Sequence, residues 1–337
     1  MKVAERHTDE GAVVAAAKAG DESAFAALVE AHRRELQVHC YRMLGSLEDS
    51  EDVVQETFLR AWRKRTSFEG RSTFRAWLYR IATNACLDVL ERQPRQAAQH
   101  DAAPPLAEVP WLQPYPDQLL EGMAVSDDEP ETEVVAKETI ELAFIAAIQL
   151  LPPKQRAVLI SRDILGWSAA ESAALLDLSV AAVNSALQRA RATLRQHLPR
   201  HRMDWPPGSD PSTAERVLLR RYMDATDRGD VAGMIKLLRE DAIFSMPPAP
   251  EWWVGNEAIV AAWVEGGFGS QSFGELRCLP TRANRQPAVA VYRRHPDDSV
   301  FRPFLLDVLQ MQEGTVSEVI AFPLEPLVDA LGLPQTL

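Results

Sequence analysis

The chain has 337 residues, more than one hydrophobic core usually serves, which indicates two or three domains. Its 46% hydrophobic and 25% charged residues are ordinary globular values and exclude a wholly disordered or fibrous chain. It has no apolar run of about 18 residues, no signal-peptide pattern and no C-x-x-C pair among its three cysteines. We therefore expect a cytoplasmic protein with no membrane segment, no disulfide framework, no metal and no cofactor.

Charge is distributed unevenly along this chain, whose net charge is −12. Residues 94–153 carry −9 and include a proline-rich run, which predicts an acidic linker between flanking domains. Residues 154–202 carry +5, and residues 60–80 hold seven basic residues against one acid. Because phosphate neutralisation supplies most of the affinity for nucleic acid, an acidic protein with local basic patches is expected to bind DNA together with a partner.

Three amphipathic helices are predicted before the linker. The first begins at an N-cap on Asp21 and ends at Gly45, the second covers residues 46–65, and the third is capped by Ser72. The second helix is acidic at its start and basic at its end, a pattern that the helix dipole alone also explains. In the loop that follows, Phe68 lies among arginines and is a candidate for stacking on single-stranded bases, whereas Trp77 has the spacing of a core residue.

A helix, a tight turn at residues 177–179 and a second helix are predicted within residues 140–198. Ser168 with Glu171 forms a capping box, and Ser179 caps the second helix. A plain helical hairpin remains an alternative, but the caps, the turn length and the basic charge favour helix-turn-helix. Outside the buried stripe of the second helix lies a small, polar face suited to the major groove: Ala181, Ala182, Asn184, Ser185, Gln188, Arg189, Arg191 and Arg195.

These stretches resemble the extracytoplasmic-function sigma factors of the sigma-70 family. The resemblance rests on SEDVVQETFLRAWRK (50–64), TFRAWLYRIATNACLDVLER (73–92) and the long helix-turn-helix run of residues 151–194. It implies a region-2 domain (10–93) that binds core polymerase and the −10 element, a linker (94–130), and a region-4 domain (131–202) that reads the −35 element. The implied core-binding residues are Asp49, Asp52, Val53, Gln55, Glu56, Phe58 and Leu59. The residues implied at the −10 strand are Arg63, Lys64, Phe68, Arg71, Phe74, Trp77, Arg80 and Asn84.

After a Pro/Gly/Ser break, residues 212–337 change character. Their pattern predicts a helical pair, a short strand AIFSMPP, a further helix and three consecutive strands, which indicates an α+β domain. This order is similar to the cone-shaped SnoaL-like domain. The overall prediction is a multidomain chain with two all-α domains followed by this α+β domain.

The role of the third domain is left open between catalysis, ligand sensing and a regulatory role through protein contacts. Asp307 is a candidate acid-base residue, although strand alternation also allows it to point outward. Candidate residues for a ligand pocket, for which an aromatic core is the alternative, are Met246, Trp252, Trp253, Trp263, Tyr292 and Asp307.

The sequence therefore predicts a non-enzymatic initiation factor whose partners are RNA polymerase core and promoter DNA, regulated in cis by its C-terminal domain. The acidic third domain is expected to pack on protein, with the linker run WLQPYP as its docking segment. Two alternatives remain at this stage: a stand-alone helix-turn-helix regulator with a ligand-sensing domain, and an enzyme with an appended DNA-binding module.

Overall fold

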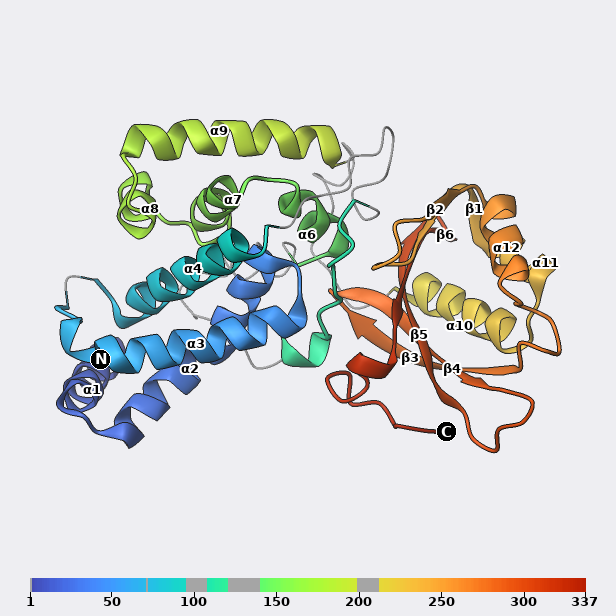
Figure 1. The fold of residues 1–337 in the computed structure, drawn as a ribbon, viewed down its shortest axis with the longest axis horizontal. Helices are drawn as coiled ribbons and strands as arrows, with labels where there is room; N and C mark the ends of the chain where they lie inside the picture. Colours follow the sequence, from blue (N-terminus) through green and yellow to red (C-terminus); the bar gives the residue numbers. More distant parts are fainter. Residues whose placement is uncertain (1, 71, 95–107, 121–139, 199–211) are drawn as a thin grey trace. The chain divides into compact units, whose positions relative to one another are not determined.

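The computed structural model describes residues 2–70, 72–94, 108–120, 140–198 and 212–337. Within these ranges the chain forms two compact units (Figure 1). Unit 1 contains helices α1–α4 and α7–α9, and unit 2 contains residues 108–120, helix α6 and residues 212–337.

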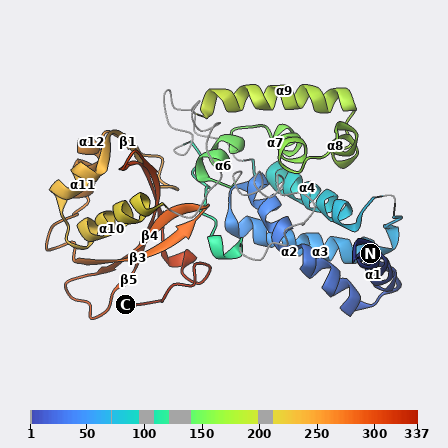
Figure 2. The same cartoon turned by 180° about the vertical axis from the view of Figure 1, so that it is seen from behind.

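Unit 1 is helical throughout its described residues. Helices α2, α3 and α4 pack against one another and are seen side by side in Figure 2, while α7 packs on α2 and α4. A π-helical turn at Ile160–Ile164 continues α7. The helices are α1 (Lys2–Ala19), α2 (Glu22–Leu44), α3 (Leu47–Lys64), α4 (Phe74–Arg92), α7 (Pro153–Leu159), α8 (Ala169–Leu176) and α9 (Val180–His197).

Local sequence signals set most of these helix ends. The Asp21 carboxylate accepts hydrogen bonds from the backbone N–H groups of Ser23 and Ala24, and Gly45 ends α2 in the left-handed region at φ 70°. The expected cap of α4 at Ser72 is wrong by one residue. The Thr73 hydroxyl accepts from the Ala76 N–H instead, because Thr73 is the last residue with extended backbone before the helix.

Unit 2 is built on a six-stranded sheet of order β2-β1-β6-β5-β4-β3. Neighbouring strands are antiparallel except for β1 and β6, which are parallel. Figure 1 shows α10 lying across the sheet, and α10 contacts β3. The elements are α6 (Leu142–Gln149), α10 (Thr213–Asp227), α11 (Val231–Leu237), β1 (Leu238–Ser245), β2 (Trp252–Val254), α12 (Asn256–Glu265), β3 (Glu275–Ala283), β4 (Gln286–Arg294), β5 (Arg302–Gln312) and β6 (Thr315–Pro323).

Two of these strands, β2 and β3, are absent from the sequence prediction. β2 has only three residues, too few for a visible alternation. β3 contains Pro280, which normally argues against a strand, but β3 is an edge strand, where a missing N–H is tolerated. The expected helices and the last three strands are confirmed, and so is the α+β class.

The linker run and helix α6 belong to unit 2. Tyr115 is fully buried, and Pro116 forms a β-bridge with Ala283 at the end of β3. The contact expected between the linker and the C-terminal domain is therefore present. Six of the eight residues of α6 are buried, and its first N–H donates to the Gln286 side chain at 3.1 Å.

Candidate functional site

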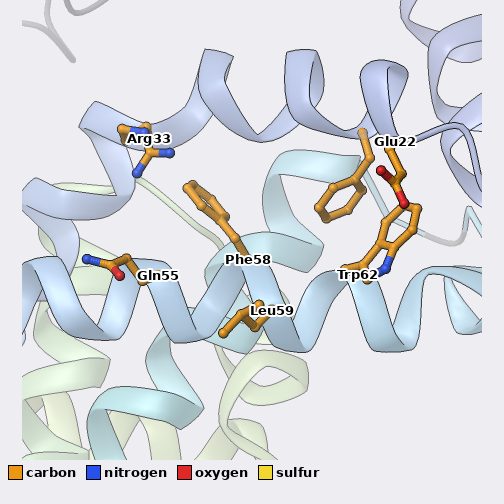
Figure 3. A pocket seen from close by; sticks show the side chains of 7 residues that line it. Glu22, Arg33, Gln55, Phe58, Leu59 and Trp62 are labelled. Carbon is orange, nitrogen blue, oxygen red and sulfur yellow. The ribbon is translucent and has the colours of Figure 1, made fainter.

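The first candidate surface is an open groove between α2 and α3 (Figure 3). The groove measures about 430 Å³ and is mostly apolar. Phe58 points from α3 toward α2, where the Arg33 guanidinium lies 5.0 Å from the centre of its ring. Leu59 is 52% exposed, which is unusual for a large apolar side chain. The lining residues are Glu22, Phe25, Arg33, Gln55, Phe58, Leu59 and Trp62.

Three residues of the expected core-binding set, Gln55, Phe58 and Leu59, lie in this groove. Asp52 is exposed and Asp49 half-buried on the acidic first half of α3. The Glu56 carboxylate forms an ion pair with the Arg60 guanidinium at 2.7 Å, and Arg60 also pairs with Asp88 of α4. Val53 is only 4% exposed, so its side chain supports the helix from within.

The residues expected at the −10 strand divide into a buried group and an exposed group. Phe68 and Phe74 are buried, and their rings meet edge to face with centroids 5.7 Å apart. Trp77 is half-buried beside both of them. Arg71 lies outside the described residues. The exposed group consists of Arg63, Lys64, Arg80 and Asn84.

Sequence reasoning missed the contact that holds the Phe68 loop. The Lys18 ammonium of α1 donates to the Phe68 carbonyl oxygen at 2.5 Å. It also missed a polar cluster on Glu35, whose carboxylate accepts from the Arg75 guanidinium at 2.7 Å and from His32. Burial alone would raise the pKa of Glu35, but these hydrogen bonds and charges lower it below its usual value. His32 and Glu35 are three residues apart on α2, but Lys18 with Phe68 and Glu35 with Arg75 are 50 and 40 residues apart, so helical spacing gives no sign of these two contacts.

The helix-turn-helix has the local geometry that its sequence predicts. The Ser168 hydroxyl and the Glu171 carboxylate form the expected capping box at the start of α8. Asp177 ends α8 in the left-handed region at φ 54°, and the Ser179 hydroxyl accepts from the Ala182 N–H. Turn and caps together fix the direction in which α9 leaves α8.

The side chains expected to read DNA are exposed to solvent along α9 and at Ser179, the residue that caps it, with the exception of Ala182. One member is already paired, because Arg191 makes two hydrogen bonds of 2.6 and 2.8 Å to Asp163. Arg189 donates to the Ser185 hydroxyl at 2.7 Å. Ala182 is half-buried, and the exposed members are Ser168, Ser179, Ala181, Asn184, Ser185, Gln188, Arg189, Arg191 and Arg195.

The six residues proposed as a ligand pocket lie on both faces of the sheet. Met246, Trp253 and Trp263 pack against the core beneath the helices. Trp252 is opposite Ser245 in the register and so faces away from that core. Tyr292 also faces the other side and donates to the Pro334 carbonyl at 2.6 Å. The structure therefore does not bring the six together.

Asp307 points inward beneath α10, where its carboxylate accepts a 3.0 Å hydrogen bond from the Tyr222 hydroxyl. Burial raises the pKa of Asp307 to about 7, and the hydrogen bond from Tyr222 partly offsets this effect. A buried carboxyl group is therefore ready to hold a proton near neutral pH.

Comparison with known proteins identifies the parts. Models of Sigma-70 region 2, Sigma-70 region 4 and the SnoaL-like domain match residues 28–96, 141–194 and 219–318. The ECF RNA polymerase sigma factor SigG of Mycobacterium tuberculosis is 42% identical over 93% of this chain and 85% of its own length. This chain belongs to the extracytoplasmic-function sigma factors.

Two further proteins are similar to this chain. The ECF RNA polymerase sigma factor SigW of Bacillus subtilis is 34% identical over 54% of this chain and 92% of its own length. The crystal structure of the Mycobacterium tuberculosis sigma factor SigJ has a similar fold, with a TM-score of 0.58 and 22% identity over 92% of this chain and 99% of that one.

The assignment decides between the alternatives left open by the sequence. A sigma factor is an initiation factor and not an enzyme, so both the stand-alone regulator and the enzyme with a DNA-binding module are set aside. In the part of the chain that the structure describes, no helix is long and apolar enough to cross a bilayer.

Proposed function

We propose that this sigma factor binds core polymerase through the groove between α2 and α3 and the acidic start of α3. The exposed Leu59 and the half-exposed Phe58 supply apolar area, and Asp52 supplies negative charge beside it. An apolar centre with charges at its rim is the usual anatomy of a protein interface. The matching surface on the polymerase is expected to be basic.

The exposed Arg63, Lys64, Arg80 and Asn84, together with Trp77, are proposed to hold the melted −10 strand. Cations follow the phosphates, and the half-exposed Trp77 offers a ring for base stacking. Phe68 and Phe74 have to leave their buried cluster in order to stack on a base. Their role in the resting structure is to support the loop.

The reading of the −35 element is assigned to the N-terminal two-thirds of α9. Gln188 and Arg189 are exposed and carry the donors that recognise base edges in the major groove. Ala181 and Ser185 are small enough to let the helix backbone approach the groove. Arg195 is assigned to phosphate.

The C-terminal domain is proposed to regulate the factor in cis, in the cytoplasm where the polymerase works. The observation that supports this role is the seating of the linker run, with Tyr115 buried against the domain.

Run-off transcription with purified core polymerase tests the central claim. Transcripts are expected only when this protein is added, and they are expected to start at specific sites. Transcription by core alone at the same sites, or none with the protein present, would refute the proposed function.

Charge reversal tests the docking surface. Asp52→Lys is expected to abolish co-purification with core while the circular dichroism spectrum stays unchanged, since Asp52 is exposed. Glu91→Lys, an exposed acid on α4, is the matched control and should leave co-purification intact. Equal binding of both variants to core would show that Asp52 is a solvent-exposed residue that does not contact the polymerase.

A further inference from the structure

Asn284, in the turn between β3 and β4, binds the linker at two residues, Tyr115 and Ile140. Its backbone N–H donates to the Tyr115 carbonyl at 2.8 Å, and its side-chain oxygen accepts from the Tyr115 N–H at 2.7 Å. Its side-chain nitrogen donates to the Ile140 carbonyl at 2.6 Å. Asn284 is fully buried, so these bonds are shielded from water.

Neighbouring residues strengthen both attachments. On the Tyr115 side, the buried Asp117 carboxylate accepts from the Arg282 guanidinium at 3.0 Å and from the Arg285 N–H at 2.8 Å. On the Ile140 side, the Gln286 side chain accepts from the Leu142 N–H and donates to Gln310. One short turn therefore holds the linker at two places that are distant in sequence.

This attachment removes chain length from the tether between regions 2 and 4. Because Tyr115 and Ile140 both bind Asn284, the chain between them adds no length to the tether. With the loop closed, residues 94–108 add at most ~50 Å of reach at ~3.3 Å per residue. With it open, residues 94–140 would add up to ~155 Å.

We propose that Asn284 is a clip that limits the tether and so narrows the range of −10 to −35 spacings that the sigma factor accepts. The inference rests on the proposed division of promoter binding between region 2 and region 4. It makes Asn284 a specificity-determining residue that acts through the linker and touches neither DNA nor polymerase.

The turn offers a clean way to open the clip. Asn284 has φ 54° and Arg285 has φ 61°, and glycine adopts such angles without strain. Asn284→Gly therefore removes both side-chain bonds and keeps the backbone shape. Arg285→Gly is the matched control, because the Arg285 backbone N–H still binds Asp117 and the Arg285 side chain takes no part in the clip.

The test uses full-length holoenzyme on a promoter that it transcribes, with the spacer between the two elements changed one base pair at a time. At spacers one or two base pairs longer than the optimum, Asn284→Gly is expected to transcribe about three to five times better than wild type, each normalised to its own optimum. The loss of both side-chain bonds weakens the attachment, so the linker leaves the turn more often, and the released tether is about three times as long. Arg285→Gly should keep the wild-type profile.

A second variant opens one arm only. Asn284→Asp keeps an acceptor for the Tyr115 N–H but cannot donate to the Ile140 carbonyl, and it should broaden the profile as Asn284→Gly does. If both folded variants gave the wild-type profile, the clip would be disproved while the sigma activity stood. If the wild-type holoenzyme gave no transcription at any spacer, the result would instead contradict the proposed function.

Discussion

The rings of Tyr79 and Trp167 meet edge to face, with centroids 5.6 Å apart and an interplanar angle of 64°. Tyr79 belongs to α4 of region 2, and Trp167 precedes Ser168, the N-cap of α8 in region 4. The buried Arg156 of α7 adds to this contact by donating to the Met43 carbonyl at the end of α2. Promoter elements about two helical turns apart, ~70 Å, require the two regions to separate.

Weakening this contact should therefore favour promoter binding. Trp167→Ala removes an aromatic pair worth about 0.5–1.5 kcal/mol, so we expect holoenzyme affinity for promoter DNA to rise up to about tenfold. Tyr79→Phe keeps the ring pair and should change affinity little. Gel-shift titration measures the effect, and a lower affinity in Trp167→Ala would mean that the packed form is the one that binds.

The exposed leucine in the α2–α3 groove should be needed for polymerase binding. Leu59→Asp is expected to weaken binding to core at least tenfold, because a carboxylate is desolvated in an apolar interface. Val217→Asp, at a 42% exposed position on α10, provides the matched control. Fluorescence anisotropy with labelled sigma factor measures both, and equal affinities would exclude the groove as the docking surface.

The arginines of α9 should differ in their effects on promoter selection. Arg189→Ala and Gln188→Ala are each expected to cost about 1–3 kcal/mol on the correct −35 element and much less on a scrambled one. Arg191→Ala should cost less, since Arg191 is already paired with Asp163. An equal loss on correct and scrambled DNA would reassign Gln188 and Arg189 to phosphate contacts.

The buried Asp307 predicts an unusual pH dependence of stability. Because its pKa is about 7 when folded and near 3.8 when unfolded, the native state binds the extra proton between these values. Stability contributed at this site is thus fully present below the unfolded pKa and falls as pH rises through the folded one, by up to about 1.4 kcal/mol per pH unit.

Asp307→Asn should remove this dependence. Relative to wild type, the variant is expected to be stabilised at about pH 8, where the buried carboxylate is ionised, and to gain little at about pH 5. Urea unfolding at both pH values, with hydrogen exchange of β5 as the local reporter, measures the difference. A larger gain at the lower pH would contradict the assignment.

Features that depend on residues close together in the sequence could be predicted, and those that depend on distant residues could not. The Ser168–Glu171 box and the Gly45 helix end depend on neighbours within four residues, and both were predicted. The pairing of Arg191 with Asp163, the bond from Lys18 to the Phe68 carbonyl and the bonds of Asn284 to Tyr115 join residues 28, 50 and 169 positions apart in the chain. An exposed and a buried arginine or phenylalanine have the same local pattern, so only the fold separates them.

The ligand-pocket set shows the same limit in the sheet. Trp252 and Trp253 are adjacent, and strand alternation places them on opposite faces. The sequence pattern left a ligand pocket and an aromatic core as alternatives, because the face of Trp252 and Trp253 depends on their register with β1. β2 takes this register by pairing with β1, and a segment of only three residues gives no alternation from which the pairing could be predicted.

The seating of the linker also sets an order of events during synthesis. Tyr115 leaves the ribosome 169 residues before Asn284, its hydrogen-bond partner. At about 5–20 residues per second, this interval lasts on the order of ten to thirty seconds. The parallel strand β6, which pairs with β1, is made later still. During this period regions 2 and 4 have been made but the linker lacks its partner Asn284, so its attachment forms only after the turn between β3 and β4 has been synthesised.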